Sequence, residues 1–175
     1  MPEICVHKRV LEMTYDLVVI GAGSGGLTAV GVAARLGAKV ALVEKHRVGG
    51  DCTWTGCVPS KALLKAAKVA HEVRTAAHYG IVSNAPVTDM GKVRDFVKAA
   101  IQSVYQFERP EDLQRQGIDV VMGEGKFLGA NSIGVDGRVI QAKHFLVTTG
   151  ARPLIPDIAG LKDVPYVHLR TDLRQ

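Results

Sequence analysis

Residues 15–26 read YDLVVIGAGSGG, and this stretch decides the fold. Its apolar run at residues 17–20 is typical of a strand buried on both faces of a parallel sheet. The glycine-rich turn that follows has the form G-x-G-x-x-G, with glycines at Gly21, Gly23 and Gly26. Because the motif follows a strand, it is read here as the first turn of a dinucleotide-binding fold.

The residues after the turn support this interpretation. Residues 27–36 carry Ala and Val at helical spacing, and Gly37 is a typical helix stop. A second apolar run at residues 39–43 ends at Glu44, eighteen positions after Gly26. The order of strand, helix and strand predicts a βαβ unit, and therefore a parallel sheet in an α/β architecture.

Each residue of the turn has a mechanical task in such a site. We expect Gly21 to make the tight turn, Gly23 to let the backbone approach a pyrophosphate, and Gly26 to let the helix pack on the strand. Ser24 lies within the same turn, and Glu44 is placed to accept hydrogen bonds from ribose hydroxyls. A glycine-rich turn needed only for helix packing is the alternative, and the motif alone does not choose between FAD and NAD.

The rest of the chain predicts two long helices and then short strands. Helices are expected at residues 57–78, where Leu64 and Ala70 belong to an apolar stripe, at 90–107, and more briefly at 111–116. We read the later segments as one more strand of the parallel sheet followed by an antiparallel meander, with a hairpin turn at 136–137. The expected strands are 119–122, 126–128, 132–135, 138–141 and 145–148. The predicted fold is Rossmann-like, of the FAD/NAD(P)-binding type.

The amino-acid composition limits the classes of function that the chain can have. A chain of 175 residues that is 47% hydrophobic has enough apolar material for one core. The net charge of +5 comes from scattered basic residues, so we do not expect nucleic-acid binding. No apolar run approaches the roughly 18 residues of a membrane span, and we expect a cytoplasmic protein without a membrane partner. We divide the chain into an extension at 1–13, a domain at 14–160 and a connector at 161–175.

Two cysteines, Cys52 and Cys57, lie five positions apart in the segment GGDCTWTGCVPSK at residues 49–61. On an ideal helix, positions i and i+5 have Cα atoms roughly 8.6 Å apart, too far for a disulfide. The two can therefore bond only if the helix is distorted or begins after Cys52, and Gly56 supplies a permissive backbone. Cys57 then lies near a helix N-terminus, where the dipole favours a thiolate. Two unlinked buried cysteines, or half of a zinc site, are the alternatives, and Cys5 is expected to be a free thiol.

The same segment closely resembles the active-site segment of the pyridine nucleotide-disulfide oxidoreductases, a family that includes dihydrolipoamide dehydrogenase, glutathione reductase and mercuric reductase. The cysteine spacing together with Pro-Ser-Lys at residues 59–61 is a specific signal. The resemblance covers nearly the whole chain from Thr14, including residues 148–153, TTGARP, which are similar to the family's Ala-Thr-Gly-x-x-Pro stretch. At Asp51, Trp54 and Thr55 the chain departs from the commoner choices, which favours the mercuric-reductase-like members.

The resemblance implies specific roles. It makes Gly21, Gly23, Gly26 and Glu44 contacts of FAD, Cys57 the thiol beside the flavin, and Cys52 the interchange thiol that attacks substrate. Lys61 matches the family's lysine near the flavin ring, where a cation can stabilise charge on the reduced ring. The remaining implied cofactor contacts are Ser24, Gly50, Thr53, Thr149 and Gly150.

The resemblance also implies what lies outside these 175 residues. In the family an NAD(P)H-binding fold follows, and members are homodimers whose interface domain completes the site. We therefore expect the FAD-binding portion of an enzyme that passes electrons from NAD(P)H through FAD to a Cys52–Cys57 disulfide and on to a small-molecule disulfide or related acceptor. On this interpretation the chain is a fragment, inactive alone and able to self-associate. A free-standing FAD-binding or thiol-redox module without turnover is the alternative.

Overall fold

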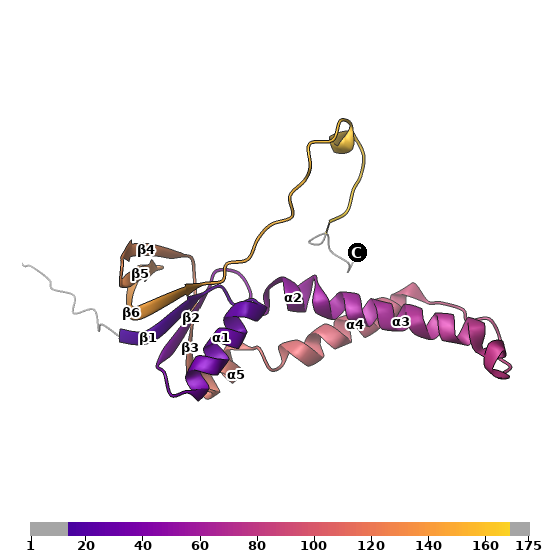
Figure 1. Cartoon of the computed structure of the whole chain (residues 1–175), viewed down its shortest axis with the longest axis horizontal. Helices are drawn as coiled ribbons and strands as arrows, with labels where there is room; N and C mark the ends of the chain where they lie inside the picture. The colour runs from indigo at the N-terminus through magenta and orange to yellow at the C-terminus, as the bar shows by residue number, and fades with distance from the viewer. Residues whose placement is uncertain (1–13, 169–175) are drawn as a thin grey trace, which may run out of the picture. The chain divides into compact units, whose positions relative to one another are not determined.

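A computed structural model describes residues 14–168, which include one six-stranded sheet (Figure 1). The strands lie in the order β3-β2-β1-β6-β5-β4. The first four are parallel to one another, and β4, β5 and β6 form an antiparallel meander. Their bounds are β1 Thr14–Ile20, β2 Val40–Glu44, β3 Ile118–Met122, β4 Gly125–Gly129, β5 Ser132–Val135 and β6 Arg138–Val147. This α/β architecture, with strand order 3-2-1 around the first βαβ unit, is the predicted Rossmann-like fold.

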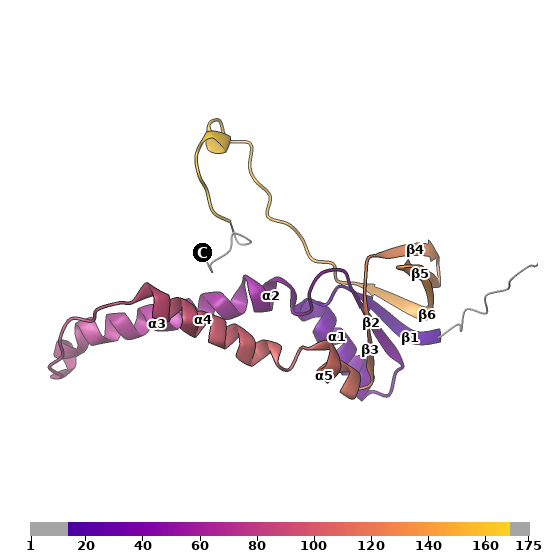
Figure 2. The same ribbon diagram turned by 180° about the vertical axis from the view of Figure 1, so that it is seen from behind.

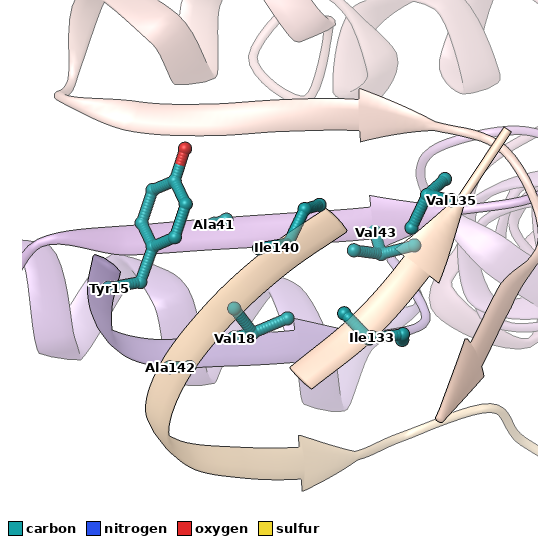
Figure 3. Close-up of a cluster of buried hydrophobic side chains, with 8 residues drawn as sticks. All are labelled: Tyr15, Val18, Ala41, Val43, Ile133, Val135, Ile140 and Ala142. Atoms are coloured by element: carbon teal, nitrogen blue, oxygen red, sulfur yellow. The ribbon is translucent and has the colours of Figure 1, made fainter. Parts of the chain in front are cut away.

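The core of the sheet is made mostly by buried Val and Ile side chains. Four consecutive residues of β2, Val40 to Val43, are buried, as expected for a strand enclosed on both faces. Helix α1, Ser24–Arg35, packs on β1 and β2 through Val30. Strands β5 and β6 contribute to a cluster with β1 and β2 (Figure 3), whose members are Tyr15, Val18, Ala41, Val43, Ile133, Val135, Ile140 and Ala142.

Strand β6 differs from the prediction. Two separate strands were expected at 138–141 and 145–148, but one strand runs from Arg138 to Val147. Its first part pairs antiparallel with β5, from Arg138 to Gln141, and the stretch from Gln141 to Val147 pairs parallel with β1. The parallel sheet therefore gains two strands after residue 117, not one. Lys143 and His144 broke the apolar pattern because their side chains are exposed.

A second group of helices is built from residues 50–105, where α3 and α4 lie side by side (Figure 2). Asp89 caps α4 by accepting hydrogen bonds from the backbone N–H groups of Gly91 and Lys92. Ala62, Val97 and Ile101 form the small core between the helices, with Trp54 and Val58 packed against it. The bounds are α2 Gly50–Trp54, α3 Cys57–Thr75, the 3-10 helix η1 Ala76–Tyr79 and α4 Met90–Tyr105; a further 3-10 turn, η2, is Leu161–Asp163.

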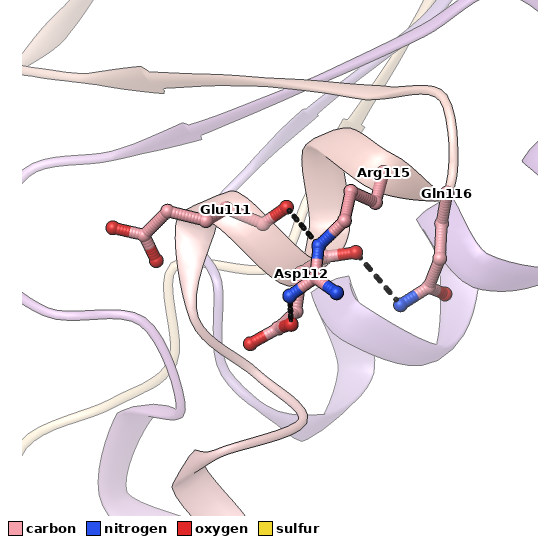
Figure 4. Close-up of polar contacts among 4 residues, drawn as sticks. All are labelled: Glu111, Asp112, Arg115 and Gln116. Atoms are coloured by element: carbon pink, nitrogen blue, oxygen red, sulfur yellow. Dashed lines mark hydrogen bonds and ion pairs between the residues drawn. The ribbon is translucent and has the colours of Figure 1, made fainter.

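The short helix α5, Pro110–Arg115, leads into β3 and packs against it through Leu113. Its polar side is held by contacts within the helix (Figure 4). Arg115 donates to the Asp112 carboxylate and the Glu111 carbonyl, and the Gln116 amide donates to the Asp112 carbonyl. These bonds satisfy groups at the end of a helix that is too short to be stable alone.

The described chain divides into two compact units. The first contains the sheet, α1 and α5, and comprises the residues up to Val48 and Pro110–Thr149. The second comprises Gly49–Arg109 and the residues from Gly150 onward. The predicted domain at 14–160 includes parts of both, and its boundaries stay a prediction. Cys5 and the extension at 1–13 lie outside the described residues, as do the last residues of the predicted connector.

Candidate functional site

The glycine turn after β1 has the geometry predicted for it. Gly21 has φ +104°, a conformation that favours glycine, and its N–H donates to the carbonyl of Val43 at 2.8 Å. A side chain at Gly21 would meet the backbone of Thr148, and one at Gly26 would overlap the carbonyl oxygen of Gly21. Gly23 is the N-cap of α1, with no side-chain capping bond. The close packing of helix on turn therefore requires glycine at both ends of the motif.

Glu44 is tied to this turn by its carboxylate. Its Oε2 accepts a hydrogen bond from the Ala22 N–H at 2.8 Å, and its Oε1 accepts one from the His46 N–H at 2.7 Å. The residue is half-buried at the end of β2. An ionised carboxylate has about four lone-pair sites, so two backbone bonds leave capacity for hydroxyl donors. Glu44 thus orders the turn as well as offering acceptors.

Thr148 is a residue of this site that sequence reasoning missed. Its Oγ1 lies 2.8 Å from the Gly21 carbonyl oxygen and 3.1 Å from that of Ile20, so its hydroxyl hydrogen bonds the backbone at the turn. A side chain at Gly26 would come within 2.9 Å of the same Oγ1. The one signal in the sequence was a hydroxyl where the family usually has alanine. Its neighbour Thr149, a predicted cofactor contact, is exposed.

These residues fit a dinucleotide. Ser24 and Gly25, in the first turn of α1, are exposed, so the helix N-terminus is accessible to an anion. The glycines keep the neighbouring backbone bare of side chains, and Glu44 stands at the end of the next strand. The residues that would hold FAD in this unit are Gly21, Gly23, Ser24, Gly26, Glu44 and Thr149.

The cysteine pair lies in the second unit, where α3 begins after Cys52, as predicted. Cys52 is in α2, which ends at Trp54, and Cys57 is the first residue of α3. The Gly56 N–H donates to the Asp51 carbonyl at 2.6 Å, and a side chain at Gly56 would stand 2.9 Å from that oxygen. The close approach of Gly56 to α2 brings the two cysteines together, and both are thiols in the structure.

The electrostatics of the pair are uneven. Burial raises the pKa of Cys52, and a side-chain hydrogen bond with Cys57 raises it further. The negative charges of Cys57 and Glu108 act in the same direction, while the positive charge of Lys61 lowers the pKa of Cys52. Cys52 is half-buried and Cys57 is exposed. Together these surroundings favour the protonated form of Cys52.

The other predicted residues of this unit are placed as follows. Lys61 is exposed on α3, one turn after Cys57, and its charge reaches Cys52. Gly50 opens α2 with φ +56°, and Gly150 is exposed with φ +71°. Thr53 is 1% exposed, and its hydroxyl donates to Glu108 Oε2 at 2.7 Å. Their roles toward a cofactor stay predictions.

Glu108 was not found from the sequence, because it lies 55 residues from its partner Thr53. Within residues 14–168 there is no group of three or more His, Cys, Asp or Glu side chains that could hold a metal ion. Over the same residues, no helix combines the length and the apolar character that crossing a membrane requires.

Comparison with known proteins identifies a family. The model of the pyridine nucleotide-disulphide oxidoreductases matches residues 15–174. Similar curated proteins include a mercuric reductase of Lysinibacillus sphaericus, 33% identical over 156 residues, which are 89% of this chain and 29% of that enzyme. A glutathione reductase of Burkholderia cepacia is 38% identical over 83% of this chain and 32% of its own length. A dihydrolipoyl dehydrogenase of Acholeplasma laidlawii is 36% identical over 87% of this chain and 46% of its own length.

The chain thus spans between about three tenths and just under half of the length of these relatives. All three enzyme types that the sequence resembles are represented, with identities too close to separate them. Members of the family are FAD-dependent and use NAD(P)H as substrate. The match over residues 15–174, together with the glycine turn and the paired cysteines, means that the chain belongs to the pyridine nucleotide-disulphide oxidoreductase family.

Proposed function

We propose that this chain supplies the FAD-binding and thiol-redox portion of a flavoprotein disulfide oxidoreductase. The observation that carries the proposal is the close approach across the break between α2 and α3, where a Cβ added at Gly56, the residue before Cys57, would stand 3.7 Å from the Cys52 Cα. Two cysteines brought together in this way need little movement to form a disulfide. The glycine turn with Glu44 supports FAD as the group that serves this pair.

When bound, FAD would accept the hydride of NAD(P)H and supply an electron pair for the cysteines. Two electrons and two protons convert the Cys52–Cys57 disulfide into two thiols. Cys52, once it has lost its proton, attacks a disulfide acceptor, forms a mixed disulfide and releases one acceptor thiol. Cys57 then attacks Cys52 in the mixed disulfide, which releases the second thiol and restores the original disulfide.

The acceptor we propose is a small-molecule disulfide or a related compound. Mercuric and glutathione reductases are both similar to this chain, so the relatives do not narrow the choice. The pair itself sets one requirement: the acceptor has to reach Cys52, which is half-buried, whereas Cys57 is exposed.

Counting thiols tests the proposal. The oxidised chain, denatured before and after mild reduction, should gain two reactive thiols, and peptide mapping should assign both to Cys52 and Cys57. Replacement of either by Ser should abolish the gain, while Cys5→Ser should leave it at two. The chain should also hold FAD, measured as visible flavin absorbance that remains with the protein after gel filtration. No gain in thiols would refute the redox function; a gain without bound flavin would favour a thiol-redox module.

A further inference from the structure

Glu108 lies beside the helix that carries Cys52, and nothing in the assigned chemistry uses it. It follows α4, and its backbone is held by two successive turns: Phe107 N–H donates to the Val104 carbonyl at 3.1 Å, and Glu108 N–H donates to that of Tyr105 at 2.9 Å. The Tyr105 ring also packs against Trp54 of α2, with ring centroids 4.7 Å apart and the rings tilted by 58°. The end of α4 is therefore fixed against α2.

The carboxylate of Glu108 sits in a niche made by α2 and the residue before it. Its Oε2 accepts the hydrogen bond from the buried Thr53 hydroxyl at 2.7 Å. At Gly49 a side chain would come within 2.8 Å of that oxygen and within 2.9 Å of both the Thr53 Cβ and the Trp54 Nε1. Gly49 also has φ +105°, so both space and backbone conformation call for glycine there. The niche exists because Gly49 has no side chain.

The same carboxylate acts on the cysteine pair. Cys52 precedes Thr53 directly, and the negative charge of Glu108 raises the pKa of the Cys52 thiol, in addition to burial and the Cys57 contact. Lys61 opposes it. Asp51 and Arg109 are the charged sequence neighbours of Cys52 and Glu108, and both make interactions of their own.

We propose that Glu108 is a positioning residue for the redox pair: its carboxylate anchors α2 through Thr53 and holds a negative charge beside the Cys52 sulfur. This inference rests on the proposed function, because it concerns the same two cysteines. In the reduced pair the charge keeps the proton on Cys52 until an acceptor or a base takes it. The anchor keeps the Cys52 sulfur facing Cys57, so the disulfide can close again.

The first test removes the charge and keeps the shape. In the reduced chain, the rate of iodoacetamide alkylation of Cys52 is followed against pH, with each cysteine resolved by peptide mass spectrometry. Glu108→Gln should move the Cys52 profile to lower pH and raise its rate near neutral pH roughly threefold or more, the order expected from removing one nearby charge. Glu72→Gln, an exposed carboxylate on α3 that pairs with Lys68, is the matched control and should leave the profile unchanged. An unchanged profile in Glu108→Gln would overturn the proposal.

The second test changes the anchor and keeps the charge. Thr53→Val removes the hydroxyl, whereas Thr53→Ser keeps it. Equilibration with dithiothreitol should show that the valine variant favours the disulfide several-fold less than the wild-type chain, while the serine variant stays close to wild type. Equal equilibrium constants for disulfide formation in the wild-type, Thr53→Val and Thr53→Ser proteins would overturn the anchoring role. This test holds even if Glu108→Gln fails to fold. A wild-type chain that forms no reversible disulfide would instead refute the proposed function, so the two failures are distinguishable.

Discussion

At the scale of single residues, several side chains serve the backbone as well as the chemistry. Glu44 holds the N–H groups of Ala22 and His46, and Thr148 bonds the carbonyls on the other side of the same turn. Sequence reasoning assigned Glu44 to the ribose from its position alone. It could not assign Thr148, because the distance from Gly21 along the chain is 127 residues and only pairing of β1 with β6 brings them together.

Replacing Glu44 with Ala should weaken FAD binding by about 1.5–3 kcal/mol, the usual size of hydrogen bonds to charged groups. The loss has two sources, the missing ribose acceptor and the two freed backbone N–H groups. Titration of the flavin-free chain, followed by quenching of flavin fluorescence, measures the effect. Glu124→Ala is the control. It removes an exposed carboxylate that forms an ion pair with Lys45 at 3.6 Å, and this variant should bind FAD as the wild-type chain does. Equal affinity of Glu44→Ala and wild type would rule out the ribose role.

Tyr15 gives the sheet a pH dependence. Burial raises the pKa of its phenol, and the hydrogen bond it donates to Asp119 at 2.8 Å adds to the shift. Because the pKa is higher in the folded than in the unfolded chain, the stabilisation is fully present below the unfolded value of about 10 and is lost as the pH rises above it. Urea unfolding at pH 8 and pH 11 should show a larger loss for wild type than for Tyr15→Phe. The same loss in both proteins would contradict this.

At the scale of elements, the existence of the longer helices was predictable but their buried faces were not. The stripe predicted on residues 57–78 included Leu64, which is 67% exposed, whereas Ala62 is buried. Periodicity reports which residues share a face, but the neighbours decide which face is covered, and in its own unit α3 is covered through Ala62 and Val58. Helix α2 was missed because five residues starting with glycine carry no periodic signal.

The break between α2 and α3 depends on Gly56. Gly56→Ala places a methyl group about 2.9 Å from the Asp51 carbonyl oxygen, so the backbone has to shift and the two sulfurs should separate. We expect a lower fraction of disulfide at a given dithiothreitol ratio, measured by thiol counting. Gly31→Ala in α1 is the control: its methyl group meets only the Arg35 side chain at 3.7 Å, and it should stabilise the chain by about 0.5–1 kcal/mol. A normal disulfide in Gly56→Ala would mean that the glycine is not what joins the pair.

At the scale of the whole molecule, the two predicted sites fall in different compact units, the glycine turn in one and the cysteines in the other. The fold class followed from one βαβ motif and one hairpin signal, because both are local. The division into units did not follow, since the first unit is assembled from residues on either side of the second. Only contacts between distant segments reveal it.

We predict that the 175-residue chain, supplied with FAD and a disulfide acceptor, will not oxidise NADH or NADPH at an enzymatic rate. Hydride transfer needs a held nicotinamide, and such positioning accounts for roughly 7–11 kcal/mol of a barrier. After Gly26 the sequence contains no second G-x-G-x-x-G turn to hold one. A stopped assay measures the rate of NADH or NADPH oxidation and compares it with the background rate of free flavin. Turnover above background that disappears in Cys57→Ser would show the chain to be a complete minimal enzyme.

The pairing of β1 with β6 has a consequence for biosynthesis. Thr14 lies opposite Gln141 and Ile20 opposite Val147. During synthesis, one edge of β1 therefore stays unpaired until its partner strand, 127 residues further along the chain, has been made. At about 5–20 residues per second, a ribosome takes on the order of 6 to 25 s to deliver it. During that interval the nascent chain presents an apolar strand with an unsatisfied edge. Translation speed between residues 20 and 141, and the presence of a chaperone to shield that edge, should therefore decide how much of the newly made protein reaches the native sheet rather than aggregating.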